Sequence, residues 1–347
     1  MIPVRPAALG RRPLVSVVIP NFNYGRFLPV TVGSVTAQQG VDLEVIIVDD
    51  RSTDGSVDIA RALAEADPRI RLIEHAVNLR HIRTFNDGLL EATGDYVVLL
   101  SADDALTPDS LVRGAALLEA HPSVGLVYGR VAWFDGDLPP VSGTALWWQV
   151  WSGTQWIRKL ARRGRNAIVS PEAMMRRSIV TDIGGYSPEF PHTSDLFMWL
   201  QAAARADVGF IGGASQAYYR NHGGNMHSTE FGGATDDARE VMSTFDGFFE
   251  REGGSLTDPT RLRRLARRGV AREAMLRAAM LQAEGAHLED AAALRGFARD
   301  LSPHGSRSAA WAWSEVARTA PRLRPMVALT ERQRWRVRTR RDDLVGL

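Results

Sequence analysis

Residues 96–104 read Tyr-Val-Val-Leu-Leu-Ser-Ala-Asp-Asp, an apolar run that ends abruptly in two adjacent carboxylates. A continuous Val/Leu run of this length between turn residues is typical of a central parallel strand that is covered on both faces. Ligands of open α/β sheets bind beyond the carboxyl ends of such strands. The stretch therefore predicts a buried strand that delivers Asp103 and Asp104 to a ligand-binding edge of an α/β sheet.

The two carboxylates repel each other, so their proximity needs an explanation. Paired carboxylates at a strand end offer the oxygen ligands that hard divalent cations prefer. The alternative is that one of them caps the helix that Pro108 opens. The residues favour a cation site at Asp103 and Asp104 and leave the capping alternative open.

The chain before this strand alternates between apolar runs and helical patterns. Buried strands are predicted over 14–20, 43–48 and 70–73, with helices over about 27–39, 57–64 and 82–92. This alternation indicates βαβ units in a parallel sheet with right-handed crossovers. Residues 14–104 thus have the pattern of a nucleotide-binding half-domain.

The chain has no glycine-rich phosphate fingerprint after the first strand and no P-loop sequence. This argues against dinucleotide dehydrogenases and against kinase or ATPase chemistry. A metal on Asp103 and Asp104, with Arg80 or Arg83 nearby, would hold phosphates instead, because Arg and divalent ions both neutralise diphosphate oxygens.

The composition is that of a globular protein, with 347 residues, 45% of them hydrophobic and 24% charged. It fits one large domain with an appendage, or two domains. A net charge of +2 does not support a nucleic-acid partner, and the lack of cysteine excludes disulfides, thiolate metal sites and cysteine nucleophiles. Residues 1–13 contain no apolar run, and no stretch reaches the length of a membrane span, so a cytoplasmic enzyme is expected.

Five blocks of the sequence, in this order, resemble glycosyltransferase family 2, the inverting enzymes of GT-A fold. The blocks are residues 17–23 (VVIPNFN), 48–54 (VDDRSTD), 78–89, 94–104 and 184–200. The resemblance implies an α/β GT-A fold with a mostly parallel sheet over residues 14–235, after a tail at 1–13. It also implies a hexosyltransferase-like enzyme that moves a sugar from a nucleotide-diphosphate donor to an acceptor hydroxyl with inversion, using Mn²⁺ or Mg²⁺.

Carried over residue by residue, the resemblance implies a nucleotide-sugar pocket near the first two strand ends. Pro20, Asn21 and Phe22 would line the base and ribose pocket, with Phe22 stacking on the base. Asp50 would accept a hydrogen bond from a base N–H, and the alternative is that Asp49 and Asp50 begin a turn. Arg80 would contact the nucleotide from a position where the family often has Gly.

The resemblance also implies the metal ligands and the catalytic base. The family's acidic triplet is Asp-X-Asp, but Ser101 occupies its first position here. Asp103 is then expected toward ribose or metal, and Asp104 toward metal. His222 would complete the metal shell or contact the diphosphate. Asp195 corresponds to the general base, and its alternative role is that of a carboxylate favoured in the first turn of a helix.

Three further expectations concern the second half of the chain. Trp147 and Trp148 are predicted to lie in an exposed loop and to contact the acceptor, with a core-filling role as the alternative. Residues 168–171 are predicted to form a strand and turn before a helix that carries Met174 and Met175. Residues 223–228 are predicted to form a mobile lid because they include paired glycines.

The composition changes at about residue 236, where Ala, Leu and Arg recur at helical spacing. Residues 236–347 are therefore predicted to form a helical appendage. Its basic stretches, 261–268 and 332–341, suggest peripheral contact with an anionic membrane, or a solvated Arg-rich face, and the helices could also form a homo-oligomer.

Two other functions stay open at this point. A nucleotidyltransferase shares the sheet and the acidic metal site but would carry a Gly-rich basic loop after the first strand. A non-catalytic nucleotide-sugar-binding or scaffold subunit is suggested by Ser101 alone. For a transferase, the acceptor could be a polysaccharide, a lipid-linked glycan or a small natural product.

Overall fold

The computed structural model describes residues 4–224, 233–285 and 287–303, together with scattered positions between 312 and 333. The chain forms two compact units. The first comprises the residues up to Gly153 and from Ile168 to Gly223, and the second comprises Thr154–Ala167 and the described residues after Gly224. The division expected from the sequence, 1–13, 14–235 and 236–347, remains a prediction, and 154–167 is the segment on which the two divisions differ most.

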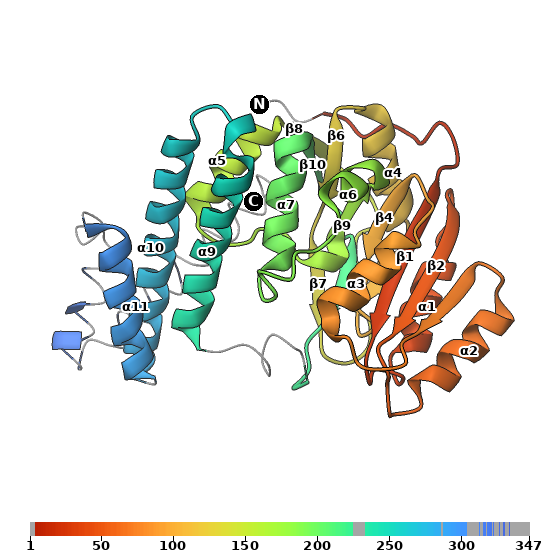
Figure 1. Cartoon of the computed structure of the whole chain (residues 1–347), viewed down its shortest axis with the longest axis horizontal. Coiled ribbons are helices and arrows are strands. Elements are labelled where there is room, and N and C mark those ends of the chain that lie inside the picture. Colours follow the sequence, from red (N-terminus) through yellow and green to blue (C-terminus); the bar gives the residue numbers. More distant parts are fainter. Residues whose placement is uncertain are drawn as a thin grey trace. The chain divides into compact units, whose positions relative to one another are not determined.

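The first unit is built on a large mixed sheet (Figure 1). In spatial order its strands are β3 (Ile70–Glu74), β2 (Asp42–Asp49), β1 (Leu14–Asn21), β4 (Tyr96–Leu99), β9 (Ala173–Arg176), β6 (Val124–Tyr128), β10 (Asp207–Gly212) and β8 (Trp147–Trp151). The four strands from β3 to β4 are parallel, as the alternating pattern predicts. β9 runs antiparallel to both β4 and β6, and β8 is antiparallel to β10. The mostly parallel sheet of an α/β fold is therefore confirmed.

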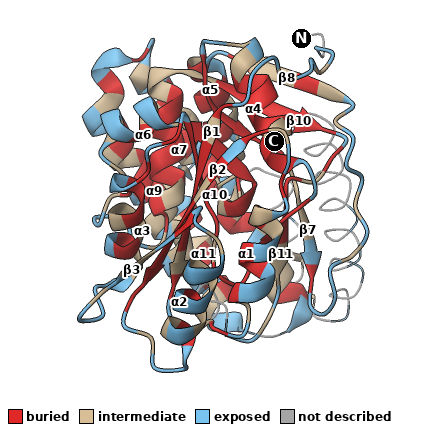
Figure 2. Ribbon diagram, turned by 90° about the vertical axis from the view of Figure 1, so that its right-hand side faces the viewer, coloured by how far each residue is buried: buried red, intermediate tan, exposed pale blue. Residues whose placement is uncertain are grey.

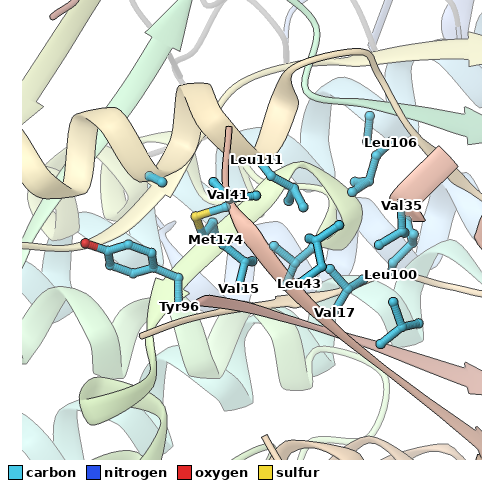
Figure 3. Packing of buried hydrophobic residues seen from close by; sticks show 14 of the residues in the cluster. Val15, Val17, Val35, Val41, Leu43, Tyr96, Leu100, Leu106, Leu111 and Met174 are labelled. Atoms are coloured by element: carbon cyan, nitrogen blue, oxygen red, sulfur yellow. The ribbon is translucent and has the colours of Figure 1, made fainter. Parts of the chain in front are cut away.

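Helices cover both faces of this sheet. They are α1 (Leu28–Thr36), α2 (Ser56–Ala66), α3 (Arg80–Leu90), α4 (Ser110–Ala120), α6 (Arg177–Ile183) and α7 (Ser194–Arg205). α3 packs closely on β1 and β2, since a Cβ added at Gly88 would lie 2.3 Å from Val18 Cγ1. On the other face, side chains of β1 and β4 join those of α1 and α4 in one apolar cluster, part of which is shown in Figure 3. Covered faces explain why β1, β2 and β4 are rich in apolar residues. Figure 2 shows β1 and β2 largely buried.

A small second sheet lies beside the large one in the first unit. Within the described residues it contains β5 (Ala105–Leu106), β11 (Ala217–Arg220) and β7 (Val131–Phe134), with β11 in the middle. β5 directly follows Asp103 and Asp104 in the chain. The small sheet therefore brings β11 next to the residues that follow β4.

The second unit is helical. Its elements are α5 (Gly153–Arg163), α9 (Ala234–Glu252), α10 (Pro259–Glu284) and α11 (Leu288–Leu301). Small side chains dominate its buried cluster, which includes Ala271, Ala274 and Ala278 of α10. The helical character expected for this part of the chain is confirmed.

The structure bears on the expected membrane contact and the expected lid only in part. No helix in the described part of the chain is both long and apolar enough to span a membrane. The basic stretch 261–268 lies in α10, where Arg263 pairs with Asp246 (2.5 Å) and Glu250 (3.3 Å). Most of the basic stretch 332–341 and most of the predicted lid, 225–228, lie outside the described residues.

Two local predictions are wrong. Met174 and Met175 lie in β9, a strand, and not on a helix, because this short apolar segment fills the gap between β4 and β6. Figure 3 shows Met174 in the core near Val15 and Val41. Trp147 and Trp148 do not form an exposed loop, since both lie in β8 and Trp148 is buried.

Candidate active site

The carboxyl ends of β1, β2 and β4 meet at one edge of the large sheet. Asn21 is in register with Asp49, and the Asp50 N–H donates to the Asn21 carbonyl (2.9 Å). The Leu100 N–H donates to the Val18 carbonyl (2.9 Å), so β4 reaches the same edge. Parallel pairing therefore gathers the acidic residues that follow β2 and β4, as the sequence predicts.

Asp103 and Asp104 are both buried at this edge, and β11 supplies their partners. The Arg220 N–H donates to Asp104 Oδ1 (2.9 Å), and Arg220 Nε donates to the Asp103 carbonyl (2.9 Å). His222 Nε2 lies 3.0 Å from Asp103 Oδ2. The helix-capping alternative is wrong, because α4 begins at Ser110 and the residue at its N-cap is Asp109.

The electrostatics of this pair favour an added positive charge. Burial raises the pKa of Asp103, and hydrogen bonding to His222 opposes the rise. Burial, followed by the neighbouring charge of Asp103, raises the pKa of Asp104 well above its usual value. The surrounding protein groups therefore compensate these charges only in part, and a divalent cation would complete the compensation.

The donor set fits a hard divalent cation. Two carboxylates supply oxygen ligands, and a neutral imidazole at His222 adds a nitrogen ligand that Mn²⁺ accepts. Among the described residues, no three His, Asp or Glu side chains are already arranged as a metal cluster. His222 bonds to Asp103, so it is either a ligand or the group that orients a ligand.

Asp50 organises the loop before α3. Its Oδ1 accepts the Leu79 N–H (2.7 Å) and lies 2.8 Å from His75 Nδ1, while Oδ2 accepts the Arg80 N–H (2.9 Å). Arg80 has a φ of 70°, a left-handed conformation that favours glycine. These bonds show how an Arg is held at a position where the resemblance leads one to expect Gly. The Arg80 side chain is exposed at the site edge.

Sequence reasoning missed His75. Its ring lies between Asp50 and Asp87, with Nε2 3.2 Å from Asp87 Oδ2. The one feature of the sequence that could have indicated this role is the position of His75 directly after β3. Arg83, which was expected near phosphate, pairs with Asp87 (2.8 Å).

The loop after β1 is fixed to the loop after β2. Asn21 Nδ2 donates to Asp49 Oδ2 (2.6 Å), and the Asn23 N–H donates to Ser52 Oγ (2.9 Å). Phe22 lies between these anchored residues and is 46% exposed, while Pro20 is partly buried. An exposed ring on a fixed loop is suited to stacking on a planar base.

Asp195 lies in the first turn of α7 and is partly buried. Its Oδ1 accepts the Leu196 N–H (2.7 Å). Burial raises the pKa of Tyr219 on β11, and so do the charges of Asp104, Asp103 and Asp195, among others. The phenol of Tyr219 therefore lies in the electric field of all three carboxylates. This places the start of α7, which carries Asp195, near the carboxyl ends of β4 and β11.

Aromatic rings surround the residues that follow β11. The His222 ring packs on Tyr24 (centroids 5.5 Å apart) and on Phe27 (5.2 Å). The Arg220 guanidinium lies 4.5 Å from the centroid of Phe27 and 4.4 Å from that of Phe134. Sequence reasoning missed Tyr24, Phe27 and Tyr219, because nothing in the local pattern links these distant segments.

A family model described as glycosyl transferase family 2 matches residues 16–184. Residues 16–184, just under half of the 347-residue chain, therefore belong to glycosyl transferase family 2. The matched stretch holds Asp50, Asp103 and Asp104, whereas Asp195 and His222 lie beyond it.

One similar protein is an uncharacterized glycosyltransferase of Nostoc sp., 40% identical over 115 residues. The match covers 33% of this chain and 35% of that protein, so the chain spans about a third of that relative's length.

Two solved structures share the fold of this family 2 chain. The S. aureus protein TarS, residues 1–349, in complex with UDP-GlcNAc, superposes with a TM-score of 0.62 at 16% identity over 92% of this chain and 91% of that chain. A mannosyltransferase from Pyrobaculum calidifontis in complex with GDP-Man and Mn²⁺ has a TM-score of 0.50 at 20% identity, covering 90% and 88% of the two chains. At such identities the likeness shows the fold alone, and it confirms the GT-A expectation.

Proposed function

We propose that this family 2 glycosyltransferase is metal-dependent and transfers a sugar with inversion from a nucleotide-diphosphate sugar to an acceptor hydroxyl. The observation that carries the proposal is the buried pair Asp103 and Asp104 at the end of β4. Burial raises the pKa of both carboxyl groups, and the charge of Asp103 raises that of Asp104 further. Fold neighbours that bind UDP-GlcNAc, or GDP-Man with Mn²⁺, support a donor of this class.

The donor's nucleotide is assigned to the edge formed by the ends of β1 and β2. Phe22 would stack on the base, with Pro20 and Asn21 lining the base and ribose pocket. Asp50 would accept a base N–H, since its Oδ2 carries a single protein hydrogen bond. Arg80, exposed at the start of α3, would contact the nucleotide phosphates.

The diphosphate is assigned to the end of β4. Asp104 and Asp103 would hold Mn²⁺ or Mg²⁺ with His222 beside them, and Asp103 would also reach the ribose. A bound divalent ion would neutralise the charge that accumulates on the departing diphosphate. Arg220 supports this site by fixing Asp104 through its N–H.

Asp195 is assigned as the general base. Inversion needs one base on the acceptor hydroxyl, opposite the leaving diphosphate, and no covalent intermediate. The Leu196 N–H fixes the Asp195 carboxylate, so the oxygen that accepts the proton is held in place. The acceptor hydroxyl would pass its proton to Asp195 while the hydroxyl oxygen attacks the anomeric carbon of the donor sugar and the nucleoside diphosphate leaves.

A thermal-shift screen tests the metal and donor assignments together. UDP- and GDP-sugars are titrated with and without Mn²⁺, and a donor at about a hundred times its Kd should stabilise the chain by about 2.7 kcal/mol. We expect stabilisation only with the metal. Asp104→Asn, which keeps the acceptor for the Arg220 N–H, should lose it.

The matched control is Asp58→Asn on α2, whose side chain is 86% exposed, and this variant should respond as the wild type does. Full transfer activity in a chelator, or undiminished donor binding by Asp104→Asn, would refute the metal assignment.

A further inference from the structure

Trp133 on β7 differs from the buried tryptophans of this chain. It is 62% exposed, while Trp148, Trp151 and Trp156 are buried. Its ring centroid lies 4.6 Å from that of Tyr219, with which it is in register across the parallel pair of β7 and β11. An exposed indole is thus held by a strand and by a phenol that packs against it with an interplanar angle of 51°.

Side chains along β7 and β11 point alternately to the two faces of the small sheet, which separates Trp133 and Tyr219 from the apolar cluster on the other face. Phe134 and Tyr218, the neighbours of Trp133 and Tyr219 in sequence, are buried in a cluster with Ala105. Side chains of successive strand residues point to opposite faces, so Trp133 and Tyr219 occupy the other face. Trp133 is not part of this buried cluster.

The open face of this pair adjoins the reacting groups. The residue after Tyr219 is Arg220, whose N–H donates to Asp104 Oδ1. The phenol of Tyr219 also lies in the field of Asp104, Asp103 and Asp195, as its raised pKa records. Phe22 and Asp50, by contrast, follow other strands, β1 and β2, so the nucleotide assignment leaves the Trp133 face free for a second substrate.

The chemistry of this face suits a sugar ring. A pyranose presents a face of C–H groups that packs on an aromatic ring, while its hydroxyls need polar partners at the rim. Trp133 offers the ring, and the Tyr219 hydroxyl and the nearby carboxylates offer the polar partners. An apolar lipid tail would gain little beside three carboxylates.

We propose that Trp133 and Tyr219 form an acceptor subsite that binds a pyranose ring, so that the acceptor presents its hydroxyl on a sugar and not on a bare aliphatic alcohol. This inference rests on the proposed function, because it assigns the second substrate of the same site.

Acceptor specificity tests the subsite. The probes are octyl glycosides of glucose, galactose, mannose and N-acetylglucosamine, with octanol as the alcohol without a ring, and the donor is the nucleotide sugar that stabilises the wild type most. We expect transfer to at least one glycoside and none to octanol. Trp133→Ala should raise the KM for that glycoside about tenfold or more, since aromatic stacking on a ring contributes about this much.

Two variants separate this role from a structural one. Trp133→Phe keeps an aromatic face and should recover most of the glycoside affinity, while Leu90→Ala removes another large exposed side chain, 82% exposed on α3, and should leave it unchanged. Donor-induced stabilisation should be equal in all variants.

Any of three results would overturn the subsite. They are transfer to octanol as efficient as transfer to the glycosides, an unchanged glycoside KM in Trp133→Ala, and donor hydrolysis without transfer to any glycoside. A wild type that neither binds nor hydrolyses any donor would instead refute the proposed function.

Discussion

At the scale of single residues, the carboxylates of the first unit differ in what surrounds them. Asp50 accepts N–H groups from Leu79 and Arg80, and Asp104 accepts one from Arg220. Asp195 accepts the N–H of the neighbouring Leu196. Residues of one type thus have distinct expected roles, which substitutions can separate.

The first prediction is that Asp195→Asn keeps donor binding while turnover falls by about 10²–10⁴, the usual contribution of a positioned base. Asn has the same size and hydrogen-bonding capacity but cannot take up the acceptor proton. Steady-state transfer kinetics and donor-induced thermal shifts measure the two effects. Asp182→Asn, a carboxylate of α6 that is 65% exposed, is the control and should behave as the wild type.

A helix-start role alone would change stability by only about 0.3–1 kcal/mol and leave turnover intact. Near-normal turnover would therefore refute the base assignment and redirect attention to His192 or Glu189. Loss of donor affinity would place Asp195 with the donor or metal ligands instead.

The second prediction concerns Glu44, which ties the opposite edge of the sheet together. It accepts hydrogen bonds from the Ser16 hydroxyl and from the N–H groups of Thr93 (2.6 Å) and Gly94 (3.0 Å). Burial alone would raise the pKa of Glu44, but these bonds outweigh it and lower the pKa below 4.5. A lowered carboxylate pKa stabilises the fold above the ordinary pKa and loses this effect as pH falls through the lowered value.

Glu44→Gln should therefore cost about 1–3 kcal/mol of unfolding free energy near neutral pH. The difference from wild type should shrink as the pH falls below 4.5, the ordinary value from which the pKa of Glu44 is lowered. Denaturant unfolding across this range measures it. A difference that stays constant with pH would show that the charge of Glu44 does not contribute.

At the scale of secondary-structure elements, α5 and α10 of the second unit approach each other at two glycines. A Cβ added at Gly269 would lie 2.2 Å from the Ala161 carbonyl oxygen, and one added at Gly164 would lie 2.1 Å from the Gly269 carbonyl carbon. The Arg272 side chain also donates to the Arg162 carbonyl (2.6 Å). These helices pack backbone to backbone, which only glycine permits.

The third prediction is that Gly269→Ala destabilises the chain even though Ala is the better helix former. The clash involves backbone atoms that cannot rotate away, and overpacking of this kind costs about 1–3 kcal/mol. Gly296 on α11 is the matched control, because a Cβ there meets nothing within 4 Å.

Gly296→Ala should instead stabilise by up to about 1 kcal/mol through helix propensity. Thermal unfolding of the two variants measures the contrast. Equal effects of the two substitutions would contradict the close approach of α5 and α10.

At the scale of the whole molecule, neither unit is a single continuous segment of the chain. Residues 154–167 interrupt the first unit in sequence but belong to the second. The groups assigned to donor binding and catalysis all precede Gly224, so the helices that follow have packing, association or acceptor access as their expected roles.

The fourth prediction is that a chain ending at Thr235 is less soluble and melts at a lower temperature than the full chain. It would leave α5 without α10, exposing surface that is covered at Gly164. Its folded fraction should still bind the donor, which a donor-induced thermal shift measures. A folded truncated chain that has lost donor binding would contradict this division of roles.

The sequence by itself determined the α/β pattern and most of the strand-end carboxylates. The strands β1, β2 and β4 are covered on both faces and are therefore rich in apolar residues. The apolar runs of β2 and β4 lead into Asp49-Asp50 and Asp103-Asp104. Parallel pairing then places these ends at one edge without further information. The family resemblance added Asp195 and His222, whose roles stay predictions.

Only the tertiary structure decided which distant segments complete that edge. Met174 and Met175 form a strand because β4 and β6 leave a gap between them, and a four-residue apolar run is equally compatible with a helix. Trp133 is exposed while Trp148 is buried, although both lie in short aromatic segments. Local sequence records whether a residue prefers burial, whereas its partners depend on the packing of elements far apart in the chain.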